Sequence, residues 1–148
     1  MKIYIGADHR GVELKNQIVK YLKEENFDVE ASSIENNELD DYPDFAFDIA
    51  KKVKRNKDAL GILICGNGIG ISIAANKVKG IRCARVVNSD DAFKAKNHNG
   101  ANIIAFGGID INLAKEIVDI FISTKTASEE RHLKRIDKID NYETENFK

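Results

Sequence analysis

The run Leu-Gly-Ile-Leu-Ile-Cys at residues 60–65 constrains the fold most, because no polar side chain interrupts it before the cysteine. A strand with one face in water alternates apolar and polar residues, whereas a strand covered on both faces does not. The run therefore predicts a central parallel strand between two layers of helices. Glycines at 66, 68 and 70 follow it, and a helix-like segment comes next.

Other short apolar runs alternate with segments of helical periodicity along the chain. Besides 60–65, we expect strands at 2–6, 27–31, 82–87 and 102–106. We expect helices at 12–25, from Pro43, at about 89–96, at 112–123 and from about 129 to 141, with a polar loop at 32–41. This order predicts a Rossmann-like α/β fold, a doubly wound parallel sheet of about five strands in three layers.

The composition fits one globular domain, 1–148, with 43% hydrophobic and 32% charged residues. A net charge of −1 gives no electrostatic reason to expect a nucleic acid or an anionic membrane as partner. The sequence shows no secretion signal and no apolar run of membrane-spanning length. Its two cysteines make neither a disulfide framework nor a zinc-ligand set, so we expect a reduced, cytoplasmic protein.

The last expected helix carries Leu133, Ile136 and Ile139 among many charges. Two interpretations stay open for this apolar seam. The helix either packs on a partner subunit or caps its own core.

Glycine-rich turns follow three of the expected strands: GADHRG at 6–11, CGNGIG at 65–70 and FGGID at 106–110. Ligands of open α/β sheets bind at the carboxyl ends of the strands, where these turns meet. The central turn lacks the Gly-Lys-Ser/Thr of a Walker A loop and the glycine spacing of the dinucleotide fingerprint. It is either a cradle for a phosphate or oxyanion, or a tight connection without a ligand.

Several reactive side chains have two interpretations from position alone. Cys65 is either a buried, inert thiol or a base or nucleophile, because it precedes the N-terminus of an expected helix. Cys83 lies inside an expected strand and is interpreted as structural. His132 is expected to be solvated. Arg131 and Arg135 share one helix face, where either Glu129 or Glu130 or a bound phosphate would neutralise them.

The chain resembles the B-type ribose-5-phosphate isomerase family, which includes allose- and galactose-6-phosphate isomerases. The motifs that carry the resemblance cover nearly the whole chain in the family's order, and CGNGIGISIAANK is highly specific. They are GADHRGVELK, DYPDFA, CGNGIGISIAANK, GIRCA, HNGANIIAFGG and RHLKR.

This resemblance implies an aldose–ketose isomerase that works through an enediolate without metal or cofactor. Cys65 matches the base that moves a proton between C2 and C1 of the open-chain sugar, and His98 matches the residue that opens the furanose ring. Fixed N–H groups aimed at developing charge are often the largest catalytic contribution. The N–H groups matching this oxyanion hole belong to Gly66, Asn67, Gly68, Ile69 and Gly70.

The resemblance also implies the groups that hold the substrate. Asp8 matches a ligand of a sugar hydroxyl, Tyr42 an aromatic beside the sugar, and Asn99 a substrate-binding neighbour of His98. The residues that match the phosphate-binding group are His9, Arg131 and Arg135. Family members are homodimers, often paired into tetramers, with each site built from two subunits, which would explain the seam on the last helix.

The chain departs from the family pattern at several positions. Asn67 replaces the usual Thr or Ser, which is thought to help move a proton between the substrate oxygens. Ile109 replaces a phosphate-binding Arg of many members, and Arg10 replaces a small or apolar residue. We hypothesise that Arg10 supplies part of the missing positive charge. Glu129 and Glu130 stand where Gly-Gly usually precedes the Arg-His pair.

The favoured function is the interconversion of ribose 5-phosphate and ribulose 5-phosphate. The same chemistry on a six-carbon aldose phosphate, such as allose or galactose 6-phosphate, is the nearest alternative. A non-catalytic sugar-phosphate sensor and a flavodoxin-like nucleotide or flavin binder are alternatives from other classes.

Overall fold

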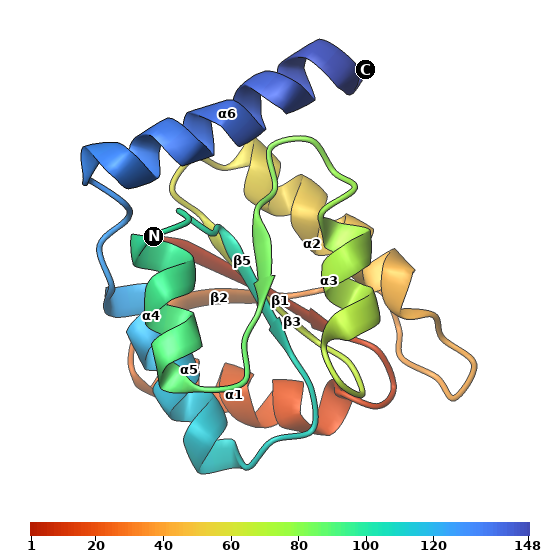
Figure 1. Cartoon of the computed structure of the whole chain (residues 1–148). Helices are drawn as coiled ribbons and strands as arrows, with labels where there is room; N and C mark the ends of the chain where they lie inside the picture. Colours follow the sequence, from red (N-terminus) through yellow and green to blue (C-terminus); the bar gives the residue numbers. More distant parts are fainter.

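A computed structural model describes all residues, 1–148, and its centre is a five-stranded parallel sheet in the order β2-β1-β3-β5-β4 (Figure 1). The strands are β1 (Lys2–Ala7), β2 (Asp28–Ala31), β3 (Leu60–Ile64), β4 (Cys83–Arg85) and β5 (Ile103–Phe106). All five residues of β3 are buried, and β1 and β5 pair with it on either side. The prediction of a central parallel strand at this run is confirmed.

Helices cover both faces of the sheet (Figure 1). Their bounds are α1 (Val12–Glu24), α2 (Tyr42–Arg55), α3 (Ile69–Ala75), α4 (Ser89–Asn97), α5 (Ile111–Ser123) and α6 (Glu130–Asn146). One core joins α1, α4 and α5 to the sheet, and a second core joins α2 and α3 to its other face. The predicted three-layer, Rossmann-like α/β architecture is therefore confirmed.

Alternating side chains of β3 divide between the two cores. Ile62 and Ile64 belong to the first core, whereas Leu63 and Cys65 belong to the second. This division follows from the alternation of side chains along a strand. It gives the run its continuous apolar character, because neither face of β3 meets water.

The fourth strand is shorter than the predicted 82–87. The backbone N–H of Arg82 donates to the side-chain oxygen of Asn102 at 2.9 Å, so a side chain replaces strand pairing at this end. Strand pairing of β4 with β5 begins at Cys83 and Ile103. Most other predicted bounds differ from the observed ones by one or two residues.

The last helix lies across the end of the sheet at which the strands begin, outside the three layers (Figure 1). It runs to Asn146, five residues beyond the predicted end, and two carboxylates tie its last turns to the segment before β4. Glu143 accepts the N–H of Gly80 at 2.8 Å, and Asp140 pairs with Arg82 at 3.0 Å. Both interpretations of its seam have some support, because Ile136 is buried whereas Leu133 and Ile139 are more than 40% exposed.

None of the helices combines the length and the apolar character needed to cross a bilayer.

Candidate active site

A cleft of about 320 Å³ lies at the carboxyl edge of the sheet, where β1 and β3 end and α2 begins. The predicted site residues in this cleft come from the turns after β1 and β3 and from the first turn of α2. They are Asp8, His9, Arg10, Tyr42, Cys65, Gly66, Asn67 and Gly70. Asp40 and Asp41 complete the lining. The structure thus brings together residues that lie up to 62 positions apart in the sequence.

Cys65 lies at the base of this cleft and is 4% exposed. Its backbone N–H donates to the carbonyl of Phe106, which continues the pairing of β3 with β5 by one residue. The N–H of Gly68 points at the sulfur, at 3.2 Å. The sulfur is therefore held in one position beside the glycine turn, residues 66–70. Burial raises the pKa of Cys83 to about 12, so that second cysteine stays a neutral thiol.

Two glycines give the turn after β3 its shape. Gly68 has a φ of +79°, and a Cβ there would lie 2.7 Å from the Cα of Phe106. A Cβ on Gly70 would lie 2.6 Å from the ring of Tyr42. Any larger residue at either position would displace backbone or the tyrosine. The glycines let the turn approach β5 on one side and Tyr42 on the other.

The turn leaves backbone donors free. The N–H of Gly68 donates to Cys65, and the N–H of Ile69 donates to the side-chain oxygen of Asn67 at 2.9 Å. The N–H groups of Gly66, Asn67 and Gly70 donate to no acceptor of the protein. Three unpaired donors beside a buried sulfur form a cradle suited to an oxyanion.

The side-chain oxygen of Asn67 accepts the N–H of Ile69, the first residue of α3, and closes the turn before the helix, whose N-cap is Gly68. The backbone carbonyl of Asn67 accepts a hydrogen bond from Nε of Arg85 at 2.8 Å. With its oxygen engaged in the turn, the side chain has its amide nitrogen left to contact a ligand.

A carboxylate that the sequence analysis did not single out organises the other wall of the cleft. Asp40 accepts hydrogen bonds from the backbone N–H and from Nδ1 of His9, at 2.9 and 2.7 Å. Its second oxygen accepts from the side chain of Asn36 and the N–H of Asn37. Asp40 lies in the polar loop at 32–41, where nothing in the sequence distinguishes it from the other carboxylates.

The His9–Asp40 pair sets the charge of this wall. The hydrogen bond to Asp40 raises the pKa of His9 above its ordinary value. Burial by itself would raise the pKa of Asp40, but its hydrogen bonds, led by that of His9, outweigh burial and lower it. Because Nδ1 of His9 is bound to Asp40, Nε2 is the nitrogen left to face a ligand.

Asp8 is buried and shapes the first turn. One of its oxygens accepts the N–H groups of Arg10 and Gly11, at 3.0 and 3.1 Å. Ligand-type atoms of Asp8, His9 and Asp40 lie within 4.8 Å of one another. The hydrogen bonds among these residues and their neighbours are sufficient to explain that grouping.

Arg10 lies over the glycine turn and has no acidic partner. A Cβ on Gly66 would meet Cδ of Arg10 at 3.1 Å and Nη1 at 3.3 Å. The guanidinium therefore borders the cradle. Ile109 packs against the first core.

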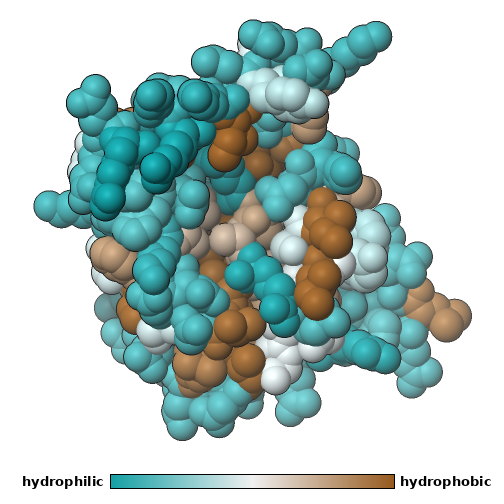
Figure 2. All heavy atoms as spheres, viewed as in Figure 1, coloured by the Kyte–Doolittle hydropathy of each residue, from teal (hydrophilic) through white to brown (hydrophobic).

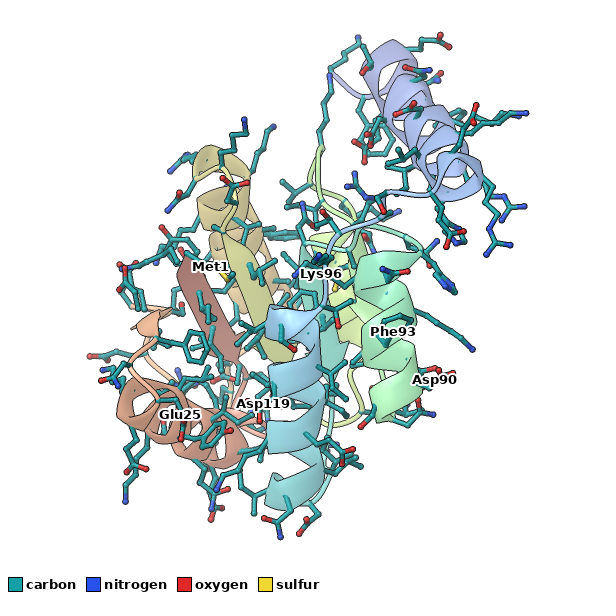
Figure 3. The ribbon with its side chains drawn as sticks, turned by 90° about the vertical axis from the view of Figure 1, so that its left-hand side faces the viewer. Met1, Glu25, Asp90, Phe93, Lys96 and Asp119 are labelled. Carbon is teal, nitrogen blue, oxygen red and sulfur yellow. The ribbon has the colours of Figure 1, made fainter.

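Gly68 and Ile69, also predicted, lie in the turn after β3 and at the start of α3, at the same carboxyl edge. The other predicted site residues lie at the opposite edge of the sheet. His98 and Asn99 follow the end of α4 and precede β5, and Arg131 and Arg135 lie on α6. Strands and helices of this fold run in opposite directions, so the end of α4 meets the beginning of the strands. The upper edge in Figure 3, near Met1 and Lys96, is this amino edge.

The surroundings of α6 correct the prediction for His132 and bear on the two interpretations of Arg131 and Arg135. His132, expected in solvent, is 5% exposed because its ring stacks on His98 with centroids 4.3 Å apart. Arg131 donates to Glu129 at 3.0 Å, which is the surface network considered for this arginine. Arg135 has no acidic partner.

Comparisons with known proteins agree with this fold. Residues 3–139 match the family model described as Ribose/Galactose Isomerase, and the chain belongs to that family. It is 42% identical to a probable ribose-5-phosphate isomerase B of Mycoplasma pneumoniae over 97% of this chain and 95% of that protein. It is also 42% identical to a putative sugar phosphate isomerase of Bacillus subtilis, over 99% and 100%.

Solved structures give the same result. Ribose-5-phosphate isomerase B of Clostridium thermocellum superimposes with a TM-score of 0.92 at 44% identity, covering 98% of this chain and 99% of that one. Ribose-5-phosphate isomerase B of Mycoplasma genitalium, solved with bound ribulose-5-phosphate, has a TM-score of 0.92 at 43% identity, covering 98% and 97%.

The hydrogen bond between His9 and Asp40 gives a test of this wall. In the Asp40→Asn variant we expect the pKa of His9 to fall toward its ordinary value, because a neutral amide no longer favours the imidazolium. NMR titration of the imidazole resonances measures it, with exposed Asp41→Asn as the matched control. An unchanged His9 pKa in Asp40→Asn would contradict the assignment.

The same pair has a defined effect on stability. Because the pKa of His9 is raised in the folded state, its contribution to the free energy of unfolding is complete below about pH 6.5 and is lost as the pH rises through the folded value. In Asp40→Asn this part of the pH dependence should disappear, while Asp41→Asn should retain it.

Proposed function

We propose that the protein is an aldose–ketose isomerase that interconverts ribose 5-phosphate and ribulose 5-phosphate through an enediolate. The observation that carries the proposal is the buried sulfur of Cys65 beside unpaired N–H donors of the glycine turn. The relatives named ribose-5-phosphate isomerase B, one of them holding ribulose-5-phosphate, support the substrate.

In this mechanism a carbanion forms next to a carbonyl. Cys65, as thiolate, removes the proton from C2 of the open-chain aldose, and the electron pair moves to O1. The free N–H groups of Gly66, Asn67 and Gly70 stabilise the negative oxygen. The hydroxyl proton then moves from O2 to O1, and the thiol returns its proton to C1 while the electron pair on O2 forms the C2 carbonyl of the ketose. No metal or cofactor takes part in this sequence.

Asn67 suits binding better than proton transfer. Its side-chain oxygen is engaged by the N–H of Ile69, so the amide nitrogen is the group left for the substrate oxygens. An amide nitrogen donates a hydrogen bond but does not carry a proton between two oxygens. We therefore propose that the proton passes directly between O2 and O1.

The complete site requires two chains. Cys65 lies at the carboxyl edge and His98 at the amino edge, separated by the length of β3, about 16 Å for a strand of this size. One pentose phosphate cannot reach both within one chain. A two-fold axis across the strands would place the carboxyl edge of one chain beside the amino edge of the other.

Exposed apolar side chains support a second copy as the partner. Figure 2 shows brown, apolar side chains over α3 and α4 and beneath α6 on one face of the molecule. The large apolar residues of these regions that are at least 36% exposed are Ile69, Ile73, Val87, Phe93, Leu133, Ile139 and Tyr142. A face of this kind on a monomer is typical of an interface. We propose a homodimer, or a tetramer made of two dimers.

The second chain would also complete the phosphate site. His9 and Arg10 of one chain provide two cationic groups, and Arg131 and Arg135 of the other chain provide two more. Asp8 and Tyr42 contact the sugar, together with Asn99 across the interface.

The role of Cys65 is tested by hydrogen exchange at C2. In the Cys65→Ala variant, exchange of the C2 proton of ribose 5-phosphate with deuterated water should fall by about 10²–10⁴-fold or more, because the base is missing. Exchange is followed by NMR, and binding by calorimetry. The matched control, Cys83→Ala, should retain exchange. A wild-type protein that binds the sugar phosphate without exchange would favour a sensor.

Turnover of a panel of five- and six-carbon aldose phosphates decides the substrate. A higher kcat/KM on allose or galactose 6-phosphate would favour the six-carbon alternative.

The shared site is tested by complementation. Cys65→Ala and His98→Ala chains, each nearly inactive, are co-expressed with different tags. In a heterodimer one site carries both intact residues and the other carries neither, so random pairing should restore about a quarter of wild-type activity. Activity no higher than that of the separate variants would contradict a site shared between chains.

Arg10 is expected to bind the phosphate in place of the arginine absent at Ile109. The Arg10→Ala variant should raise KM for ribose 5-phosphate about 10-fold or more with a smaller change in kcat, because a charge-assisted hydrogen bond is lost. Steady-state kinetics measure it, with the exposed Lys134→Ala as control. An unchanged KM would show that Arg10 does not bind the substrate.

A further inference from the structure

The ring of His98 is held by aromatic contacts rather than by hydrogen bonds. Its imidazole nitrogens have no hydrogen-bond partner in the chain, and only the backbone N–H of the residue donates, to Lys94. His132 covers one face of the ring at a centroid distance of 4.3 Å and an interplanar angle of 17°. Phe93 of α4, visible in Figure 3, meets the ring edge-on at 6.1 Å and 73°.

His132 itself is unusual for a buried polar side chain. Its Nε2 is buried without a hydrogen-bond partner, and the nearest acid, Glu129, is 3.9 Å away. Leaving a buried donor or acceptor unpaired costs about 1–3 kcal/mol. Within this chain the buried ring therefore acts as a flat surface against His98 and not as a hydrogen-bonding group.

We propose that His132 is a positioning residue for ring opening, fixing the plane of the His98 imidazole through the stack. The proposal rests on the proposed function, in which His98 opens the furanose ring. Opening requires a proton to leave the hydroxyl on C1 and another to reach the ring oxygen, so the imidazole edge must meet these oxygens at hydrogen-bond distance. A ring free to rotate about its side-chain bonds would meet them only part of the time.

The charge of His132 suits this role. Burial lowers its pKa, and His98, Arg131 and Arg135 lower it further, while Glu129 opposes them. His132 is therefore neutral at neutral pH. A neutral ring can therefore lie stacked on His98, at a centroid distance of 4.3 Å, without placing a second positive charge beside it.

A comparison of ribose 5-phosphate with ribulose 5-phosphate distinguishes a loss of His98 positioning from general damage to the site. Ribose 5-phosphate is mainly a furanose and must be opened before C2 can react. Ribulose 5-phosphate stays open, because its phosphate occupies the O5 that would close the ring. Deuterium exchange at C1 of ribulose 5-phosphate therefore needs Cys65 and the cradle but no ring opening.

The experiment uses His132→Leu, which fills the space without a flat ring, and His132→Phe, which keeps the stack without nitrogens. In His132→Leu, kcat for ribose 5-phosphate should fall by about 10- to 100-fold. The rate of deuterium exchange into ribulose 5-phosphate should stay within about 2-fold of wild type. His132→Phe should recover most of the lost kcat, and exposed Lys134→Ala serves as control. Should His132→Leu not fold, His132→Asn takes its place.

Equal losses on both substrates would overturn the proposal, since they would indicate a structural role for His132. Unchanged kinetics on ribose 5-phosphate would overturn it as well. Failure of the proposed function looks different: the wild-type protein would then exchange no deuterium into ribulose 5-phosphate.

Discussion

The burial of β3 on both faces is the constraint on which the rest of the structure depends. Its five apolar residues divide between the two cores and so require a layer of helices on each side of the sheet. The strand ends at the carboxyl edge of the sheet, beside the polar residues of the cleft, and Cys65 is the residue that follows it. The same packing that hides the sulfur from bulk water also brings the glycine turn over it.

Much of the fold was predictable from the sequence because it follows local rules. The apolar runs at 2–6 and 60–65 and the helical stripes around them indicated the parallel sheet and its carboxyl edge. The start of β4 was not predictable, because it depends on a side chain, Asn102, that replaces a backbone partner. The end of α6 depends likewise on Glu143 reaching Gly80, a contact 63 residues apart in the sequence.

The candidate site was predictable to the extent that glycines and strand ends mark it. The motif around Cys65 indicated both the sulfur and the cradle. Asp40 was not found, since one carboxylate in a polar loop looks like any other until the loop folds back onto His9. His132 was misjudged for a related reason: it lies in a segment of the sequence rich in charged residues, but its neighbour in space is the ring of His98.

The separation of Cys65 from His98 by a full strand has a consequence for how activity relates to amount of protein. In a newly folded chain the proposed base and the proposed ring-opening group lie at opposite ends of the sheet, so folding alone would not complete the proposed site. In the proposed two-chain site, turnover would begin only with association, and the yield of active sites would grow with the square of chain concentration when chains are scarce. Below a certain expression level, the protein would then be present mainly as inactive single chains.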